Sequence, residues 1–375
     1  MTDRIILAQT PSYDQAAVAA GIAEILDGLG GIDKFVQPGE RVLLKPNMLE
    51  GLPPERAVTT HPEVVRALIR TVRQAGAIPL VGDSPGHGGT RKVAAKCGIL
   101  AVCEEEGVEL LDFAIATEVA IPQGTTVKKL LVAKAVFEVD KIVSIAKMKT
   151  HSFTTITGAV KNLFGCIVGA DKAQFHLRMK RRDHFAGMLV DLARLISPML
   201  FIVDGVVGME GKGPRNGDPK QVGLLLGGTN GFAVDLVMAR VMGFEAEKMP
   251  VAAQALKLGL VPPLTELELT GSGSGVRTQF APPLHMESLE SRLPGWIVNV
   301  GQNQLTARPE IEDHCVGCGR CVEHCPPQAM KLVDGRPKID YKTCIRCYCC
   351  QELCPHNAVQ LKSGLVLKAA KRLLG

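Results

Sequence analysis

The residues with the clearest chemistry are eight cysteines near the C-terminus, in two copies of the pattern C-x2-C-x2-C-x3-C-P. Three closely spaced thiolates on one loop suit three irons of a [4Fe–4S] cubane, and the cysteine before the proline is carried to the neighbouring cubane. We therefore predict two clusters, each completed by the other half of the repeat. The first cluster would be held by Cys315, Cys318, Cys321 and Cys354, and the second cluster by Cys325, Cys344, Cys347 and Cys350.

The repeat extends beyond the cysteines. "RPEIE", which starts at Arg308, precedes the first run, and "RPKID", which starts at Arg336, precedes the second. A short strand, a cluster loop and a short helix are expected twice, so residues 306–362 resemble the two-cluster bacterial ferredoxin, a small α+β module. This segment holds eight Lys or Arg and seven Asp or Glu residues. It lacks the strongly acidic surface that steers a freely diffusing carrier to its partners, which favours a built-in electron relay.

A pair of zinc sites is the alternative for these cysteines. Structural zinc commonly uses two separated C-x2-C pairs, whereas a run of three cysteines followed by C-P is typical of iron–sulfur ligation. Cys349 lies beside Cys350 and is interpreted as a non-ligand near the second cluster, although the two could exchange roles. The isolated Cys97, Cys103 and Cys166 are interpreted as buried small apolar residues.

Composition narrows the class of protein. The chain has 375 residues, a net charge of +5, 46% hydrophobic and 4% aromatic residues, which predicts an aliphatic globular protein of roughly two or three domains. No concentrated basic face is apparent, so no nucleic-acid partner is expected. No apolar run approaches the length of a membrane span and no signal peptide is recognisable. We therefore expect a cytoplasmic protein, in which so many cysteines favour metal or redox chemistry over disulfides.

Strand-like and helix-like segments alternate through residues 1–245. The apolar strands "RIILAQ", "RVLLKPN" and "IPLVGDSPG" are followed by helical patterns over about 13–29, 62–74 and 90–106, and a helix leads to the strand "MLFIVDG". This alternation predicts an α/β layered domain with a largely parallel sheet. Residues 246–305 are rich in Pro, Gly and Ser and are expected to be a covering segment and linker. Residues 363–375 are expected to form a short C-terminal helix, packed on the protein in preference to a membrane surface.

Polar side chains follow the ends of four predicted strands: Lys45 and Asn47, Asp83 and Ser84, Lys147 with Lys149 and His151, and Asp204. Because ligands bind at the carboxyl ends of parallel strands, we expect one cleft there. Alternation along the third strand places its two lysines and its histidine on one side. Adjacent lysines repel unless an anion lies beside them. Lys161 and Asn162, in the glycine-flanked "TGAVKNLFG", are expected to join this cleft.

Two further segments each have two interpretations. The glycine-rich stretch 205–218, which carries Glu210, is either a flexible surface loop or a ligand loop, and it does not fit a Walker A motif. The basic stretch "DKAQFHLRMKRRDHF" is interpreted first as a solvated helix and second as a lid that closes over an anion. His176 and His184 could act as acid–base groups or metal ligands, although isolated histidines usually do neither.

Five motifs in order, "VLLKPN", "GDSPG", "KMKTH", "TGAVKNLFG" and "DGVVGMEGKGP", make residues 4–245 similar to the domain-of-unknown-function-362 family. Members often carry a C-terminal two-cluster ferredoxin module. The resemblance implies one shared site and assigns no roles within it. The residues of that site would be Lys45, Asn47, Asp83, Lys149, His151, Lys161, Asn162, Asp204 and Glu210.

Three functions are compatible with these features. The first hypothesis is an iron–sulfur oxidoreductase in which two [4Fe–4S] clusters pass electrons to an anionic substrate or cofactor in the cleft, with a redox partner protein as donor or acceptor. Lys45, Lys149 and Lys161 would hold a carboxylate or phosphate, and His151 or Asp83 would supply protons. The second is a non-catalytic electron-transfer adaptor that docks a partner enzyme. The third is a cluster-sensing or metal-handling protein.

Overall fold

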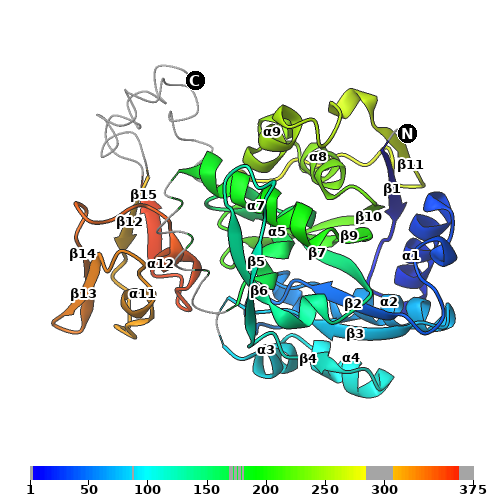
Figure 1. The fold of residues 1–375 in the computed structure, drawn as a ribbon. Helices are drawn as coiled ribbons and strands as arrows, with labels where there is room; N and C mark the ends of the chain where they lie inside the picture. Colours follow the sequence, from blue (N-terminus) through cyan, green and yellow to red (C-terminus); the bar gives the residue numbers. More distant parts are fainter. Residues whose placement is uncertain are drawn as a thin grey trace.

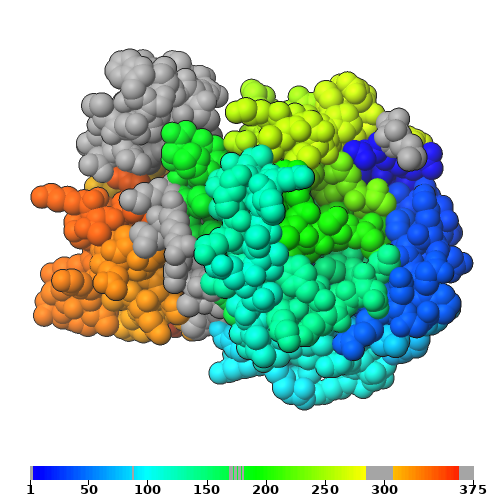
Figure 2. Space-filling model, in the orientation of Figure 1, coloured from blue at the N-terminus to red at the C-terminus, as the bar shows by residue number. Residues whose placement is uncertain are grey.

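The computed structural model describes residues 3–86, 88–168, 172, 175, 179, 181–283 and 307–362. It consists of a large domain, residues 3–283, and a cluster module, residues 307–362. Figure 1 shows the module beside the end of the large domain at which α7 (Arg182–Ile196) begins. Figure 2 shows the module, in orange, at one side of the large domain, and side-chain contacts such as that between Ser152 and Gln351 join the two.

A nine-stranded sheet forms the centre of the large domain. Its order is β11-β1-β10-β9-β7-β2-β3-β4, with β8 paired to β7. All pairs are parallel except those made by β10, which runs against β1 and β9, and by β8. The strands are β1 (Arg4–Gln9), β2 (Arg41–Pro46), β3 (Ile78–Gly82), β4 (Leu110–Leu111), β7 (Lys141–His151), β8 (Thr155–Thr157), β9 (Leu200–Glu210), β10 (Asp218–Gly228) and β11 (Glu268–Thr270).

Helices cover both faces of this sheet, because its strands are apolar on both sides. Ile6 and Ala8 of β1 pack in one core with residues from α1 (Gln15–Leu29), α2 (Pro62–Gln74), α3 (Thr90–Lys96) and α4 (Ile99–Glu106). Ile5 and Leu7 pack in the other core, with residues from α5 (Ala159–Asn162), α7, α8 (Gly231–Val241) and α9 (Pro250–Lys257). This alternation with a period of two places successive side chains on opposite faces. The predicted α/β domain with a largely parallel sheet is confirmed.

Short elements complete the large domain. A separate antiparallel hairpin consists of β5 (Ala116–Ala120) and β6 (Lys129–Ala133). The buried carboxylate of Asp191 on α7 accepts hydrogen bonds from the backbone N–H groups of Thr125, Thr126 and Val127, which fixes the turn of this hairpin. The 3-10 helices are η1 (Ile32–Lys34), η2 (Pro54–Arg56), η3 (Lys134–Phe137), η4 (Leu163–Cys166), η5 (Ala246–Lys248) and η6 (Leu264–Glu266).

The structure differs from the sequence prediction in three places. The helix predicted over 90–106 is two helices, because Gly98 takes a left-handed conformation with φ 80° and starts α4. The stretch 205–218 is not one flexible loop, since β9 and β10 extend into it as a paired hairpin that ends in a short turn. The strand containing "VGLLLGG" is antiparallel to its neighbours. Within the segment 246–305, residues 246–283 form η5, α9, η6 and β11.

The cluster module contains two similar halves. Strand β12 (Arg308–Ile311) pairs with β15 (Val359–Lys362), and β13 (Met330–Val333) pairs with β14 (Arg336–Ile339). Each half has one short helix, α11 (Arg320–Glu323) and α12 (Cys349–Glu352). The predicted small α+β module is confirmed. The helix predicted for residues 363–375 lies outside the described residues, as does His176.

Candidate functional site

The cysteines of the module line two separate cavities. Cys315, Cys318, Cys321 and Cys354 line one, and Cys325, Cys344, Cys347 and Cys350 line the other together with Cys349. These are the two groups that the spacing predicts, each with three thiols from one run and one from the other. All are free cysteines. Burial and the nearby thiols of Cys354, Cys315 and Cys318 raise the pKa of Cys321 to about 11. Bound iron would favour the thiolates that this crowding opposes.

The loops that carry the cysteines are shaped alike. Gly317 and Gly319 in the first loop have φ values of 69° and 75°. Arg346 and Tyr348 occupy the matching positions of the second loop, with φ values of 57° and 63°, where a side chain makes this conformation costly. Each cavity is lined by three cysteines of one run and one cysteine of the other, which is the ligand arrangement of a [4Fe–4S] cubane in a two-cluster ferredoxin.

A third and larger cavity lies between the two domains. Its volume is about 330 Å³. The large domain contributes residues from the ends of its strands and from the segment after β3, and the module contributes residues beside its cluster ligands. The lining includes Asn47, Glu50, Asp83, Ser84, Lys149, His151, Thr157, Lys161, Asn162, Phe164, Gly165 and Lys172 from the large domain, and His324, Cys349, Glu352 and Leu353 from the module. We call it the interdomain cavity.

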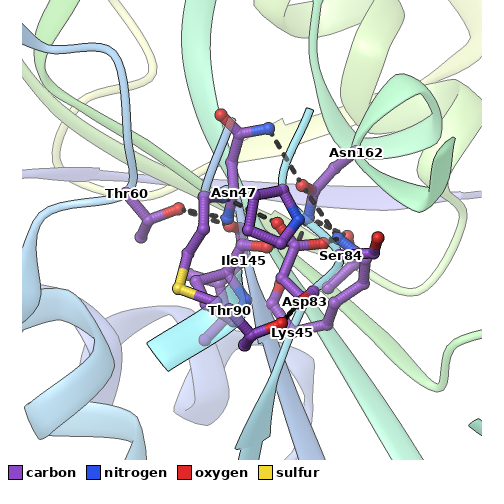
Figure 3. A network of polar contacts seen from close by, with 12 residues as sticks. Lys45, Asn47, Thr60, Asp83, Ser84, Thr90, Ile145 and Asn162 are labelled. Atoms are coloured by element: carbon purple, nitrogen blue, oxygen red, sulfur yellow. Dashed lines mark hydrogen bonds and ion pairs between the residues drawn. The ribbon is translucent and has the colours of Figure 1, made fainter. Parts of the chain in front are cut away.

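A buried polar network supports one side of this cavity (Figure 3). The ammonium of Lys45 lies 2.7 Å from Oδ1 of Asp83, and both side chains are nearly inaccessible. Lys45 also donates to Oδ1 of Asn162 at 3.3 Å, and the amide of Asn47 donates to the same oxygen. The backbone N–H of Met48 donates to the other oxygen of Asp83. These predicted residues therefore lie together, with Lys45 behind the lining and not part of it.

The glycine in "NLFG", Gly165, is required by its close contact with the Lys45–Asp83 ion pair. A Cβ atom at this position would lie 2.0 Å from Oδ1 of Asp83 and 2.7 Å from Nζ of Lys45. Only a residue without a side chain lets η4 approach the ion pair this closely. The backbone of Gly165 also accepts a hydrogen bond from the N–H of Ser84. The close approach holds Lys161 and Asn162 over the ends of the strands.

Three lysines give the interdomain cavity positive charge. Lys149 donates to Oδ1 of Asn47 at 2.7 Å and to the carbonyl of Val58 at 2.6 Å. Burial, and then the like charges of Lys161 and Lys147, hold the pKa of Lys149 well below its usual range. These bonds are to neutral oxygens, so they orient the ammonium without neutralising it.

Lys161 and Lys172 are also without a carboxylate partner among the described residues. The ammonium of Lys161 lies 4.7 Å from the ring centre of Phe164, and burial lowers its pKa to about 8. Lys172 donates to the carbonyl oxygens of Ser84 and Pro85, and burial lowers its pKa to about 7. Both lysines are half-buried, and Glu352 and Asp83 attract them without forming a direct ion pair; an anion bound in the cavity would add to this attraction.

His151 is fixed by its neighbours on the chain. Its Nδ1 accepts hydrogen bonds from the backbone N–H groups of Phe153 and Thr154. An accepting Nδ1 carries no proton, so the proton of the neutral ring is on Nε2, which lies 3.6 Å from Oε1 of Glu352. These contacts fix the ring of His151 in the lining of the interdomain cavity, next to Glu352. The acid–base role expected for His151 stays a prediction.

Glu352 and Thr157 bring unpaired oxygens into the cavity. Within the described ranges, Oε1 of Glu352 and Oγ1 of Thr157 are buried without a hydrogen-bond partner, and both residues line the interdomain cavity. Burial raises the pKa of Glu352 to about 7, while Lys161 and Lys149 oppose this shift. The cavity thus combines cations, an acceptor and a hydroxyl, which suits a ligand with an anionic group and a further polar group.

Two predicted residues lie elsewhere. Asp204 is buried against Lys147 at 2.8 Å and accepts from the hydroxyl of Tyr13, and Glu210 pairs with Lys220 at 2.9 Å. Neither lines the interdomain cavity. The register between β7 and β9 shifts after the Lys147–Asp204 pair, because β9 contains the extra residues, and Lys149 lies opposite Met209. Lys147 and Asp204 form a satisfied structural pair beside the site.

The module is held in place by side chains from both domains. The guanidinium of Arg215 contacts the carboxylate of Glu50 and donates to the carbonyl of Cys354 at 2.9 Å. Arg320 of the module lies 3.1 Å from the same carboxylate. The hydroxyl of Ser152 donates to Oε1 of Gln351 at 2.9 Å. These contacts place α12, which carries Cys350 and Glu352, against the ends of β7 and β8.

Sequence reasoning missed several of these residues. Glu352 lies within "CCQELC", where the cysteine spacing gives no signal for the glutamate. Lys172 belongs to a run of charged residues, a pattern that predicts a solvent-exposed face. Lys172 shows that this run is at least partly an inward-facing segment. The predicted acid–base alternative His184 is exposed and does not line the cavity. No helix in the described part of the chain has both the length and the apolar character to cross a membrane.

Comparisons with known proteins agree with this architecture. The family model described as domain of unknown function (DUF362) matches residues 42–240, and the 4Fe-4S dicluster domain model matches residues 314–358. A relative from Synechocystis sp. (strain ATCC 27184 / PCC 6803 / Kazusa), named thylakoid-associated protein sll1697, is 37% identical over 271 residues, which cover 71% of this chain and 83% of that protein.

Two solved structures are distant neighbours. One is a structural-genomics protein from Thermotoga maritima, with 16% identity, a TM-score of 0.39, and coverage of 65% of this chain and 60% of that one. The other is the lactate racemase apoprotein from Thermoanaerobacterium thermosaccharolyticum, with 14% identity, a TM-score of 0.36, and coverage of 58% and 54%. Domains of the 4Fe-4S ferredoxin type are used for electron transfer. The two family models show that the chain belongs to the DUF362 family and has a C-terminal 4Fe-4S dicluster domain of the ferredoxin type.

Proposed function

We propose that this protein is an iron–sulfur oxidoreductase that exchanges electrons between its two clusters and an anionic substrate or cofactor in the interdomain cavity. One observation supports this above the others. The cavity is lined on one side by Lys149, Lys161 and Lys172 and on the other by Cys349 and Glu352, the neighbours of a cluster ligand. A ligand bound by the lysines would therefore lie next to the module.

The residues of the large domain would bind and orient this ligand. The ammonium groups of Lys149 and Lys161 would attract a carboxylate or phosphate, and the hydroxyl of Thr157 would donate to a second polar group. Lys45, Asn47, Asp83 and Asn162 would act as positioning residues, because their mutual contacts hold Lys149 and the backbone of η4 in place.

Clusters of this kind supply single electrons at low potential. Protons to accompany them would come from Lys161 or Lys172, whose pKa values are lowered to about 8 and about 7 and so allow release near neutral pH. The alternative proton donors are His151, whose Nε2 lies 3.6 Å from Oε1 of Glu352, and Asp83, which is paired with Lys45.

A redox partner protein would exchange electrons with the module, as ferredoxin-type domains do. The cytoplasmic location stays a prediction, and the name of the Synechocystis relative associates that protein with the thylakoid.

A single-turnover experiment tests the proposal. Full-length protein with both clusters is photoreduced without oxygen and mixed with the anionic small-molecule fraction of a cell extract, and cluster reoxidation is followed by absorbance. The wild type should be reoxidised. Lys161→Met should be slower by roughly tenfold to a hundredfold, since it loses a charge-assisted bond. Lys220→Met, which removes a lysine remote from the cavity, should match the wild type.

Two results would contradict the proposal. Equal reoxidation of all three proteins would show that the lysine-lined cavity is not involved. Absence of reoxidation in the wild type would favour the non-catalytic adaptor.

A further inference from the structure

The second cluster and the interdomain cavity share a wall. Cys349 lines the cavity that holds the second group of thiols and also lines the interdomain cavity. It starts α12, next to the ligand Cys350. His324, the neighbour of the ligand Cys325, lines the interdomain cavity as well. A ligand in the interdomain cavity would thus be separated from the second cluster by one layer of side chains.

The first cluster has no cysteine of its group in the lining of the interdomain cavity, although Leu353, the neighbour of its ligand Cys354, lines that cavity. Among the described residues, the cavity lined by its four cysteines shares no lining residue with the interdomain cavity. Its own loop faces solvent: Cys318 is exposed, and Val316 between the first two ligands is 62% exposed. Leu332, which lies 3.4 Å from the position that a Cβ would take on Gly319, is also exposed on this side.

We infer that the two clusters act in a fixed order. The second cluster exchanges electrons with the ligand in the interdomain cavity, and the first cluster exchanges electrons with a partner redox protein at the surface around Val316. The ligand in this inference rests on the proposed function. The order of the clusters rests on the shared wall at Cys349 and on the exposure of the first loop.

Charge provides a way to tell the two clusters apart. Reduction adds one negative charge to a cluster, and a nearby cation favours it by an amount that falls with distance. Lys161 interacts electrostatically with Cys349 and Glu352 on α12. Removing the charge of Lys161 should therefore disfavour reduction of the second cluster more than that of the first. A cation placed at position 316 should favour reduction of the first cluster.

Redox titrations followed by electron paramagnetic resonance can measure both effects in the full-length, cluster-loaded protein. Cys318→Ser and Cys344→Ser identify which signal belongs to the first and which to the second cluster. Lys161→Met should then lower the reduction equilibrium constant of the second cluster by roughly tenfold, about 59 mV for one electron, with a smaller effect on the first. Val316→Lys should raise the constant of the first cluster with a smaller effect on the second. Lys220→Met should change neither.

The inference is overturned if Lys161→Met shifts the first cluster as much as the second, or if Val316→Lys shifts the second cluster more than the first. Lys161→Met keeps an aliphatic side chain of similar length. Val316→Lys changes an exposed position, so this variant is expected to fold even if Lys161→Met does not. The titrations contain no added anion. If the proposed function fails, anions will not reoxidise the clusters, but these shifts in reduction potential will still be seen. The two failures can therefore be told apart.

Discussion

Arg215 makes the strongest contacts between the large domain and the cluster module. Its side chain is 7% exposed, contacts the carboxylate of Glu50 and donates to the carbonyl of Cys354. Without it, Glu50 keeps its contact with Arg320, and the carbonyl of Cys354 keeps only the weaker hydrogen bond from the backbone N–H of Asn357. Hydrogen bonds of charged groups contribute about 1.5–3 kcal/mol each. We expect Arg215→Ala to weaken docking by about 3 kcal/mol, roughly a hundredfold in the equilibrium between docked and undocked module.

Hydrogen exchange of the cluster-loaded protein measures this change. Amides in 211–217 and 349–354 should exchange up to roughly a hundredfold faster in Arg215→Ala, because they open with the interface. Amides of β2 and β3 should keep their wild-type rates. Arg308→Ala, which removes a half-exposed pair with Glu310, serves as the control and should change neither region. Wild-type exchange at the interface of Arg215→Ala would refute the reasoning.

Three further predictions concern the cavity and the clusters. Gly165→Ala should lower the free energy of unfolding by about 2–4 kcal/mol, because its Cβ would force apart Lys45 and Asp83. Denaturant unfolding checks this against Gly275→Ala, where the added atom meets nothing, and equal stabilities would contradict it. Reoxidation by anions should slow as pH rises through about 8, where Lys161 loses its proton. Lys161→Met should lack this limb of the pH profile, and an unchanged limb would assign the titration to another group. Cys318→Ser should remove the first cluster and leave the large domain folded, as measured by iron content and circular dichroism, and two surviving clusters would refute the ligand assignment.

The sequence predicted the features that depend on local spacing. The order of the eight cysteines predicts the two groups of thiols that the structure brings together, because the ligand run has a fixed geometry. Strand ends also predicted that Lys45, Asn47 and Asp83 lie at one edge of the sheet, since parallel strands deliver their carboxyl ends to the same side.

Other features depend on contacts between distant segments, which local patterns do not contain. Asp204 was expected at the end of a strand, but β9 continues to Glu210, and Asp204 lies within it, opposite Lys147, with which it forms an ion pair. The role of Arg215 depends on docking of a module more than a hundred residues away. Glu352 enters the cavity only because this docking turns α12 toward the large domain.

Native mass spectrometry of the full-length protein, purified without oxygen, tests the central claim most directly. The wild type should carry two [4Fe–4S] clusters and an additional bound small molecule. Lys161→Met should keep both clusters and lose the additional mass, and Lys220→Met should keep both. Two clusters with no additional mass in the wild type would contradict a ligand in the interdomain cavity and would be the result expected of a non-catalytic adaptor.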